Sequence, residues 1–184
     1  MGRIIAVANQ KGGVGKSTTA INLSACLAEK GKKVLAIDID PQGNTTSGLG
    51  VDKNTVENTL YELLLGQADA KSTIVKNVVE NLDLIPSNVN LSGAEIELIG
   101  VDDKEYILKR ITDKIRRKYD YIIMDCPPSL NMLTINALTA ATSVLVPIQC
   151  EYYALEGLSQ LIHTIDLVKI KQTSCYGRRC VYYV

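Results

Sequence analysis

The fold is decided by one stretch of the chain, Gln10-Lys11-Gly12-Gly13-Val14-Gly15-Lys16-Ser17-Thr18. It follows an apolar run, Ile4-Ile5-Ala6-Val7-Ala8, that predicts a buried strand, and it leads into a helical pattern that begins near Ser17. A strand, a glycine-rich turn and a helix start bring backbone N–H groups together around an anion, and the helix dipole favours negative charge there. The stretch therefore predicts a phosphate-binding loop.

The residue types in this loop suit nucleotide binding. Glycine at 12, 13 and 15 allows positive φ and lets phosphate oxygens approach the backbone without meeting a Cβ atom. Lys16 is predicted to bind the β- and γ-phosphates, and the Ser17 hydroxyl to bind Mg²⁺. The strict motif asks for glycine where this chain has Gln10, and Lys11 is an additional lysine. The predicted phosphate-binding residues are Gly12, Gly13, Val14, Gly15, Lys16, Ser17 and Thr18. A glycine-rich turn that binds nothing is the alternative.

Bulk properties indicate a soluble globular protein of one domain. At 184 residues the chain is long enough to bury a sizeable core. Its 20 basic and 20 acidic residues give zero formal net charge, which does not support a broad nucleic-acid footprint. No signal peptide or membrane-spanning run is evident in the sequence. Five irregularly spaced cysteines favour a reduced, cytoplasmic protein.

Outward from the loop, helical and strand patterns alternate. The helix predicted at 17–30 is followed by a short buried strand at 33–38, and together with the first strand they form a right-handed βαβ unit. Further strands are predicted at 81–86, 119–125 and 143–148, and further helices at 56–66, 89–99, 103–118 and 154–170. The predicted fold class is α/β, a doubly wound and mainly parallel sheet of the P-loop NTPase type.

The predicted helix at 103–118 has two different faces. One face is apolar, and the opposite face carries Lys109, Arg110, Lys114, Arg116, Arg117 and Lys118. A solvated helix face is the favoured interpretation, and a nucleic-acid patch is the alternative.

The regular pattern ends near Lys171. Residues 1–171 are predicted to form one domain around the phosphate loop, and residues 172–184 an irregular tail, with a short edge strand at 180–184 as the alternative. A truncated or frameshifted reading frame would explain this change, so the fold is expected to be incomplete at the C-terminus.

Three carboxylates are predicted to meet the phosphate loop. Asp38 and Asp40 follow the strand at 33–38, and Asp125 ends the strand at 119–125. Carboxyl ends of parallel strands meet at one edge of an open sheet, which is where such sheets bind ligands. Asp38 is predicted to contact the water shell of Mg²⁺, and Asp125 to lie near Mg²⁺ as in a Walker B strand. Asp40 is predicted to orient the attacking water. Helix capping or Asx turns are the structural alternative for these residues.

These motifs resemble the ParA/MinD superfamily of deviant Walker A ATPases. Residues 11–18 resemble the deviant Walker A box with its signature lysine, and residues 38–44 resemble its companion motif. Residues 125–129 and 149–157 resemble the chromosomal ParA, or Soj-type, branch. The resemblance covers residues 1 to about 170.

The resemblance implies an ATP- and Mg²⁺-dependent switch with weak, partner-stimulated ATPase activity. Family members form a homodimer around their nucleotides, so Lys11 would act on the partner's phosphates and Gly12 would permit the close approach. Lys16 would bind ATP, and Asp40 would serve hydrolysis. The family further implies a ParB-type partner and chromosome or plasmid partition. It also implies nucleoid-associated, non-specific DNA binding through parts that follow residue 184 and, in spore formers, regulation of replication initiation and sporulation.

Two other functions fit part of the sequence. Related deviant Walker proteins carry iron–sulfur clusters between two subunits, and Cys126 and Cys150 would be the candidate ligands. Neither cysteine belongs to a CxxC pair, which favours buried thiols. The other candidate is a truncated nucleotide-binding fragment without partition activity, whose sheet edge is exposed. A MinD-like membrane role is not expected, because the tail shows no amphipathic helix.

Overall fold

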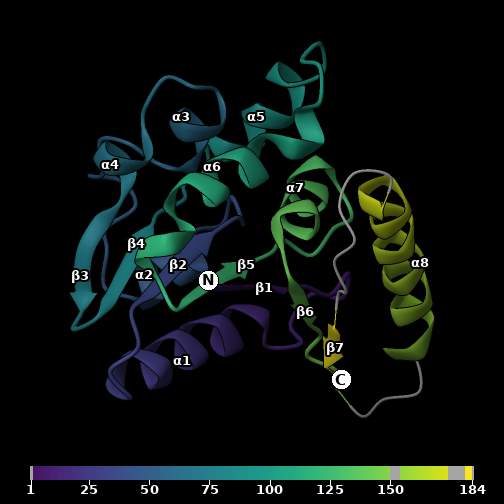
Figure 1. The fold of residues 1–184 in the computed structure, drawn as a ribbon, viewed down its shortest axis with the longest axis horizontal. Helices are drawn as coiled ribbons and strands as arrows, with labels where there is room; N and C mark the ends of the chain where they lie inside the picture. Colours follow the sequence, from purple (N-terminus) through teal and green to yellow (C-terminus); the bar gives the residue numbers. More distant parts are fainter. Residues whose placement is uncertain (1, 150–153, 174–180, 184) are drawn as a thin grey trace.

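The computed structural model describes residues 2–149, 154–173 and 181–183 (Figure 1). Within these ranges a seven-stranded sheet has the order β3-β4-β2-β5-β1-β6-β7. Six strands pair in parallel: β1 (Arg3–Val7), β2 (Val34–Asp38), β4 (Leu82–Ile85), β5 (Tyr121–Asp125), β6 (Ser143–Leu145) and β7 (Val181–Tyr183). The remaining strand, β3 (Val75–Val79), runs antiparallel to β4 at one edge.

Helices cover both faces of this sheet (Figure 1). One core cluster joins α1 (Lys16–Glu29) and the end of α2 (Asn44–Gly48) to one face. The larger cluster joins the other face to α3 (Leu60–Leu64), α5 (Leu91–Glu97), α6 (Ile107–Ile115), α7 (Met132–Ala140) and α8 (Ala154–Thr173). A short helix, α4 (Ala70–Thr73), precedes β3, and the 3₁₀ turns η1 (Lys104–Tyr106) and η2 (Arg116–Lys118) flank α6. The predicted α/β, doubly wound and mainly parallel fold is confirmed.

Local patterns identified most elements next to the phosphate loop and missed others. The predictions at 17–30, 33–38, 81–86, 119–125 and 143–148 correspond to α1, β2, β4, β5 and β6. The antiparallel strand β3 was not predicted. Neither was α7, which is buried along most of its length and therefore shows no amphipathic pattern.

The helix α2 was not predicted from the sequence. Residues 44–48 form α2, which begins after Gly43 in a left-handed conformation (φ 63°). Side chains of Thr45 and Thr46 in its first turn donate hydrogen bonds to Asp125 and Asp38, and these tertiary contacts favour the helix. The predicted helix at 56–66 is also shorter. It begins only after Thr59, where Thr59 and Glu62 form a capping box.

The predicted basic face of α6 contains one residue that is not solvated. Arg116 is 4% exposed, and its Nη2 donates to the carbonyl of Gly2 at 3.0 Å. Its Nη1 lies 3.4 Å from Oδ1 of Asp113. Arg116 therefore ties the end of α6 to the start of β1, while the other five basic residues are exposed or half-buried.

The C-terminal part of the described chain contributes α8 and an edge strand. Leu161 and Ile165 of α8 are buried in the core, whereas Ile162 is 42% exposed. The strand β7 pairs with β6 at Val181–Tyr183, which is the edge-strand alternative for the tail, and residues 174–180 and 184 lie outside the described ranges. Among described residues, no helix has the length and apolar character needed to span a membrane.

Gly2 gives a test of how β1 is anchored. A Cβ atom at this position would clash with the carbonyl oxygen of Tyr119 and lie 2.9 Å from that of Arg116. We expect Gly2→Ala to lower the free energy of unfolding by roughly 1–3 kcal/mol, as overpacking does, measured by urea denaturation. Gly100→Ala is the matched control, because a Cβ there meets nothing within 4 Å. Equal stability of the two variants would contradict this packing.

Candidate active site

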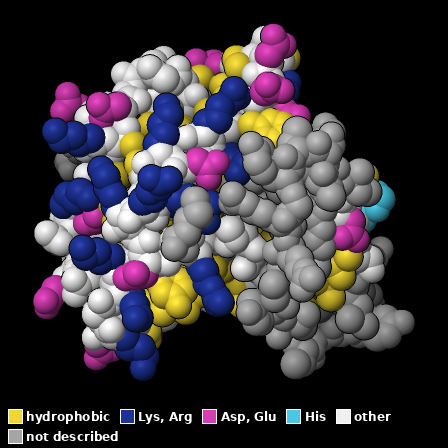
Figure 2. Space-filling view, viewed as in Figure 1, with side chains coloured by type: hydrophobic (Ala, Val, Ile, Leu, Met, Phe, Trp, Pro, Cys, Tyr) yellow, Lys and Arg dark blue, Asp and Glu magenta, His cyan; other side chains and the backbone are white. Residues whose placement is uncertain are grey.

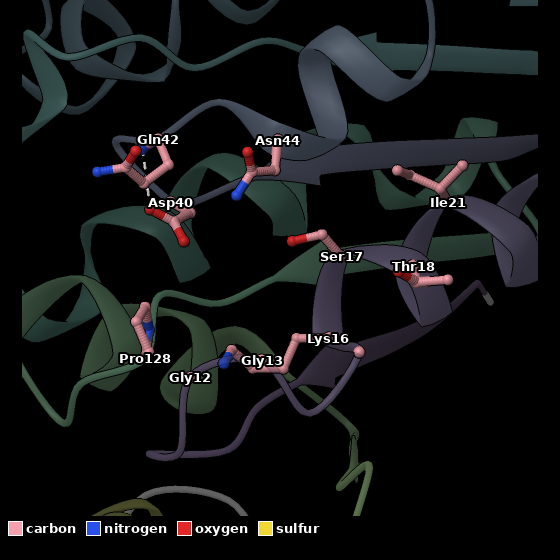
Figure 3. A pocket seen from close by; sticks show the side chains of 11 residues that line it. Gly12, Gly13, Lys16, Ser17, Thr18, Ile21, Asp40, Gln42, Asn44 and Pro128 are labelled. Carbon is pink, nitrogen blue, oxygen red and sulfur yellow. Dashed lines mark hydrogen bonds between the residues drawn. The ribbon is translucent and has the colours of Figure 1, made fainter.

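The phosphate loop joins the end of β1 to the start of α1 (Figure 3). Gly13 (φ 73°) and Gly15 (φ 87°) adopt the left-handed conformation that favours glycine. Gly15 is also the N-cap of α1, and no side chain caps the first turn. An added Cβ at Gly12, Gly13 or Gly15 would meet no atom within 4 Å. The loop is therefore open on the side where an anion would approach the helix amides.

Lys16 is held over this loop. Its side chain is 7% exposed, and Nζ donates to the carbonyl of Lys11 at 3.0 Å. Burial lowers the pKa of Lys16, while the carboxylates of Asp125 and Asp40 act in the opposite direction. Asn9 fixes the start of the loop, because Oδ1 accepts from the Lys11 amide at 3.0 Å and Nδ2 donates to the Pro147 carbonyl at 2.8 Å.

A cavity of about 510 Å³ lies against the loop (Figure 3). Figure 3 shows Ser17, Asp40 and Asn44 around the same space, although they come from α1, the loop after β2 and α2. Of the predicted site residues, the cavity is lined by Gly12, Gly13, Gly15, Lys16, Ser17, Thr18 and Asp40. Val14 is buried, and Lys11, Asp38 and Asp125 are not among the lining residues.

Asp125 is fully buried at the end of β5. Its Oδ2 accepts a hydrogen bond from the Thr45 hydroxyl at 2.7 Å. In the described part of the chain its Oδ1 has no hydrogen-bond partner. Burial raises the pKa of Asp125, while the nearby hydroxyls of Ser17 and Thr45 act to lower it. An unpartnered carboxylate oxygen close to a serine hydroxyl fits Mg²⁺, which prefers oxygen ligands.

Asp38 is Asp125's register partner on β2 and is also fully buried. Both of its oxygens are occupied: Oδ2 accepts from the amide and hydroxyl of Thr46 at 2.7 Å each, and Oδ1 from the Asp40 amide at 3.2 Å. Burial raises the pKa of Asp38 to about 7. These contacts make Asp38 an anchor for α2 and for the Asp40 backbone, and they do not place it at the cavity.

Asp40 is 7% exposed and reaches the cavity. Its Oδ1 accepts from the Gln42 amide at 2.9 Å, and its carbonyl accepts from the Gly43 amide at 2.9 Å and the Ser87 hydroxyl at 2.8 Å. Backbone and side chain are thus both fixed, with the carboxylate beside the open space (Figure 3).

Comparisons with known proteins agree with this geometry. Residues 2–175 match the family described as AAA domain. Over 169 residues the chain is 60% identical to the sporulation initiation inhibitor protein Soj of Bacillus subtilis, covering 92% of this chain and 67% of Soj. The chain belongs to the ParA/Soj family of ATPases. It is also 53% identical to the chromosome partitioning protein ParA of Myxococcus xanthus, covering 92% of this chain and 60% of that ParA.

Solved structures with bound nucleotide share the fold of this ParA/Soj family member. A cobyrinic acid a,c-diamide synthase from Mycobacterium smegmatis with bound ATP analog and magnesium superposes with a TM-score of 0.88 at 44% identity, covering 92% of this chain and 69% of that chain. A putative plasmid partition protein from Borrelia burgdorferi bound to AMPPNP gives 0.82 at 34% identity, covering 99% and 73%. The chain spans 60 to 67% of the length of the Soj and ParA relatives compared above.

The cysteines give little support to an iron–sulfur carrier. Cys126 is fully buried, and burial raises the pKa of its thiol, which disfavours the thiolate that a cluster needs. Cys26 is exposed on α1. No group of three or more His, Cys, Asp and Glu side chains is placed to hold a metal ion within the described ranges. Cys150 lies outside those ranges.

Sequence reasoning missed the residues that hold the carboxylates. Thr45, Thr46 and Ser87 each donate a hydroxyl hydrogen bond to the aspartate region. A pair of adjacent threonines directly after the Asp38–Asp40 loop was the available signal. These threonines could be assigned as hydrogen-bond donors only from the structure, in which α2 lies against the end of β5.

The raised pKa of Asp38 predicts that the stability of the folded chain depends on pH. Because its pKa is near 7 in the folded chain and about 4 in an unfolded one, the folded state holds the extra proton between these values. This stabilisation is complete below about pH 4 and is lost as pH rises through 7. In EDTA, we expect Asp38→Asn to reduce the fall in unfolding free energy between pH 5 and 8, measured by urea denaturation. The exposed Asp102→Asn is the control and should follow the parent protein.

Proposed function

We propose that this chain binds Mg²⁺ and ATP and hydrolyses ATP as a ParA/Soj-type switch in chromosome or plasmid partition. One observation carries the proposal: the buried carboxylate of Asp125 lies near the Ser17 hydroxyl and an open glycine loop, and among the described residues its Oδ1 has no hydrogen-bond partner. The backbone amides of the loop suit the phosphates of a nucleotide. The oxygens of Asp125 and Ser17 suit the divalent cation bound to those phosphates. The proposed ATPase domain comprises residues 1–171.

Each predicted residue receives a role that its surroundings support. Lys16 and the amides of the loop bind the phosphates, and Ser17 binds Mg²⁺ with Asp125 next to it. Bound Mg²⁺ would neutralise phosphate charge during hydrolysis. Asp40 orients the attacking water, because its carboxylate borders the cavity and is held in place by Gln42. Asp38 supports these residues by anchoring α2 and the Asp40 amide.

We further propose a homodimer in which Lys11 acts on the partner's phosphates. Lys11 does not line its own cavity, and its carbonyl is used to hold Lys16. Gly12 presents no side chain and is exposed, which permits close approach of a second chain. The chain spans 60 to 67% of the length of its Soj and ParA relatives. We therefore propose the remaining properties for the whole protein: DNA binding, a ParB-type partner, nucleoid association in the cytoplasm, and effects on replication initiation or sporulation.

Lys16→Ala tests the phosphate loop. Removal of the ammonium should weaken ATP binding at least about 100-fold, since a buried charge-assisted contact is lost. The measurement is calorimetric titration with ATP and Mg²⁺. Lys32→Ala removes an exposed lysine beyond the far end of α1 and should bind as the parent does. If Lys16→Ala binds ATP with unchanged affinity, the nucleotide does not use this loop.

Asp40→Ala tests the hydrolytic role. ATP affinity should stay within about threefold of the parent, while turnover should fall roughly 100-fold or more, because positioning of the nucleophile is lost. Turnover is measured as phosphate release, with and without a ParB-type partner. The exposed Asp52→Ala is the control. Turnover of Asp40→Ala at the parent rate would assign the role to another residue.

A further inference from the structure

A second cavity lies at the opposite edge of the sheet from the phosphate loop. It measures about 290 Å³, and Lys33, Lys76, Lys118, Asp83 and Tyr119 are among the residues that line it. Lys33 directly precedes β2, and Lys118 and Tyr119 lie just before β5. Asp40 and Asp125, by contrast, lie at the carboxyl ends of these strands. This basal cavity is therefore separated from the ATP site by the length of the strands.

Asp83, the one acidic residue among the described residues that line the basal cavity, is already neutralised. Oδ2 of Asp83 accepts from the Tyr119 hydroxyl and from Lys76 Nζ at 2.6 Å each, and Oδ1 accepts from the Asn77 amide at 3.0 Å. Burial acts to raise the pKa of Asp83, but these hydrogen bonds outweigh it and the pKa is lowered. Burial and the Asp83 contact raise the pKa of Tyr119 to about 12, so its hydroxyl keeps the proton that it donates.

A second carboxylate, that of Asp120, lies beside Lys33, because its Oδ2 accepts a hydrogen bond from the Lys33 backbone amide at 2.9 Å. Lys33 and Lys118 are exposed, and in the part of the chain that the structure describes no acidic side chain forms an ion pair with either ammonium. Three lysines and one aspartate give the lining a net charge of +2, in a chain whose formal net charge is zero. Figure 2 shows lysine and arginine side chains on the face over β3, β4 and α6, with acidic side chains between them.

We propose that the basal cavity binds a phosphate-bearing anion through Lys33 and Lys118, with Lys76, which is paired with Asp83, also lining the cavity. Lysine ammonium groups bind phosphate as point charges, and the three lysines among the described lining residues supply the positive charge that such an anion needs. A volume of about 290 Å³ exceeds that of one water, about 30 Å³ in the liquid, by enough to admit a diphosphate group. The phosphate belongs either to a free small molecule or to a nucleic-acid backbone.

The test uses inorganic pyrophosphate and the Lys16→Ala chain, so that the phosphate loop does not contribute. Calorimetric titration should show saturable binding. Adding Lys33→Gln and Lys118→Gln should weaken it at least tenfold. The control adds Lys71→Gln and Lys114→Gln, two exposed lysines outside the cavity, and makes the same change in net charge. With Lys16 intact, the Lys33→Gln/Lys118→Gln chain should bind ATP as the parent does, which verifies its fold.

A short DNA duplex distinguishes the two sources of phosphate. Binding of pyrophosphate without binding of DNA identifies a free phosphorylated ligand. DNA binding that pyrophosphate displaces and that Lys33→Gln/Lys118→Gln weakens identifies the backbone phosphate. The proposal is overturned if pyrophosphate does not bind saturably to the Lys16→Ala chain, or if the cavity and control variants bind it equally well.

Discussion

Two carboxylates buried side by side determine how the chain folds at the carboxyl ends of the strands, where the proposed ATP site lies. Asp38 and Asp125 are register partners on β2 and β5, and neither is exposed to solvent. Burial and the proximity of like charges both disfavour ionisation of the pair. The compensation comes from α2, whose Thr45 and Thr46 donate to one carboxylate each. The chain after β2 must therefore fold back over both strand ends, and this brings Asp40 and Asn44 to the cavity wall.

The elements that the sequence predicted correctly are those whose local residue pattern matches their burial in the fold. The run before the loop is apolar because β1 lies between β5 and β6, and α1 begins where the glycines end. By contrast, α2 depends on tertiary hydrogen bonds from residues that individually favour loops and caps. The burial of α7 on nearly every side removes the periodicity that sequence analysis uses. The edge strand β3 is held to β4 partly by the Lys76–Asp83 contact, which no local pattern contains.

The same distinction applies to the site. Strand ends alone predicted three aspartates at one edge of the sheet, and in the structure Asp38 and Asp125 end neighbouring strands while Asp40 lines the cavity. The finer assignment of each aspartate depends on which oxygen is free. Asp38 is the register partner of Asp125, yet its oxygens accept hydrogen bonds from Thr46 and from the Asp40 amide. One oxygen of Asp125, by contrast, has no partner in the described part of the chain. Sequence spacing does not distinguish two buried aspartates that differ only in their hydrogen-bond donors.

Positive and negative groups lie on opposite sides of the proposed ATP site. Lys16 and the amino end of α1 make the β1–α1 side positive, while Asp40 and Asp125 make the opposite side negative. Lys16 is coupled to both carboxylates, which oppose the effect of burial on its pKa. An anion alone would compete with the carboxylates for Lys16, and a cation alone would compete with Lys16 for the carboxylates. A phosphate group that carries its own divalent cation satisfies both sides at once. This requirement follows from charge placement and favours a metal–nucleotide complex over either component alone.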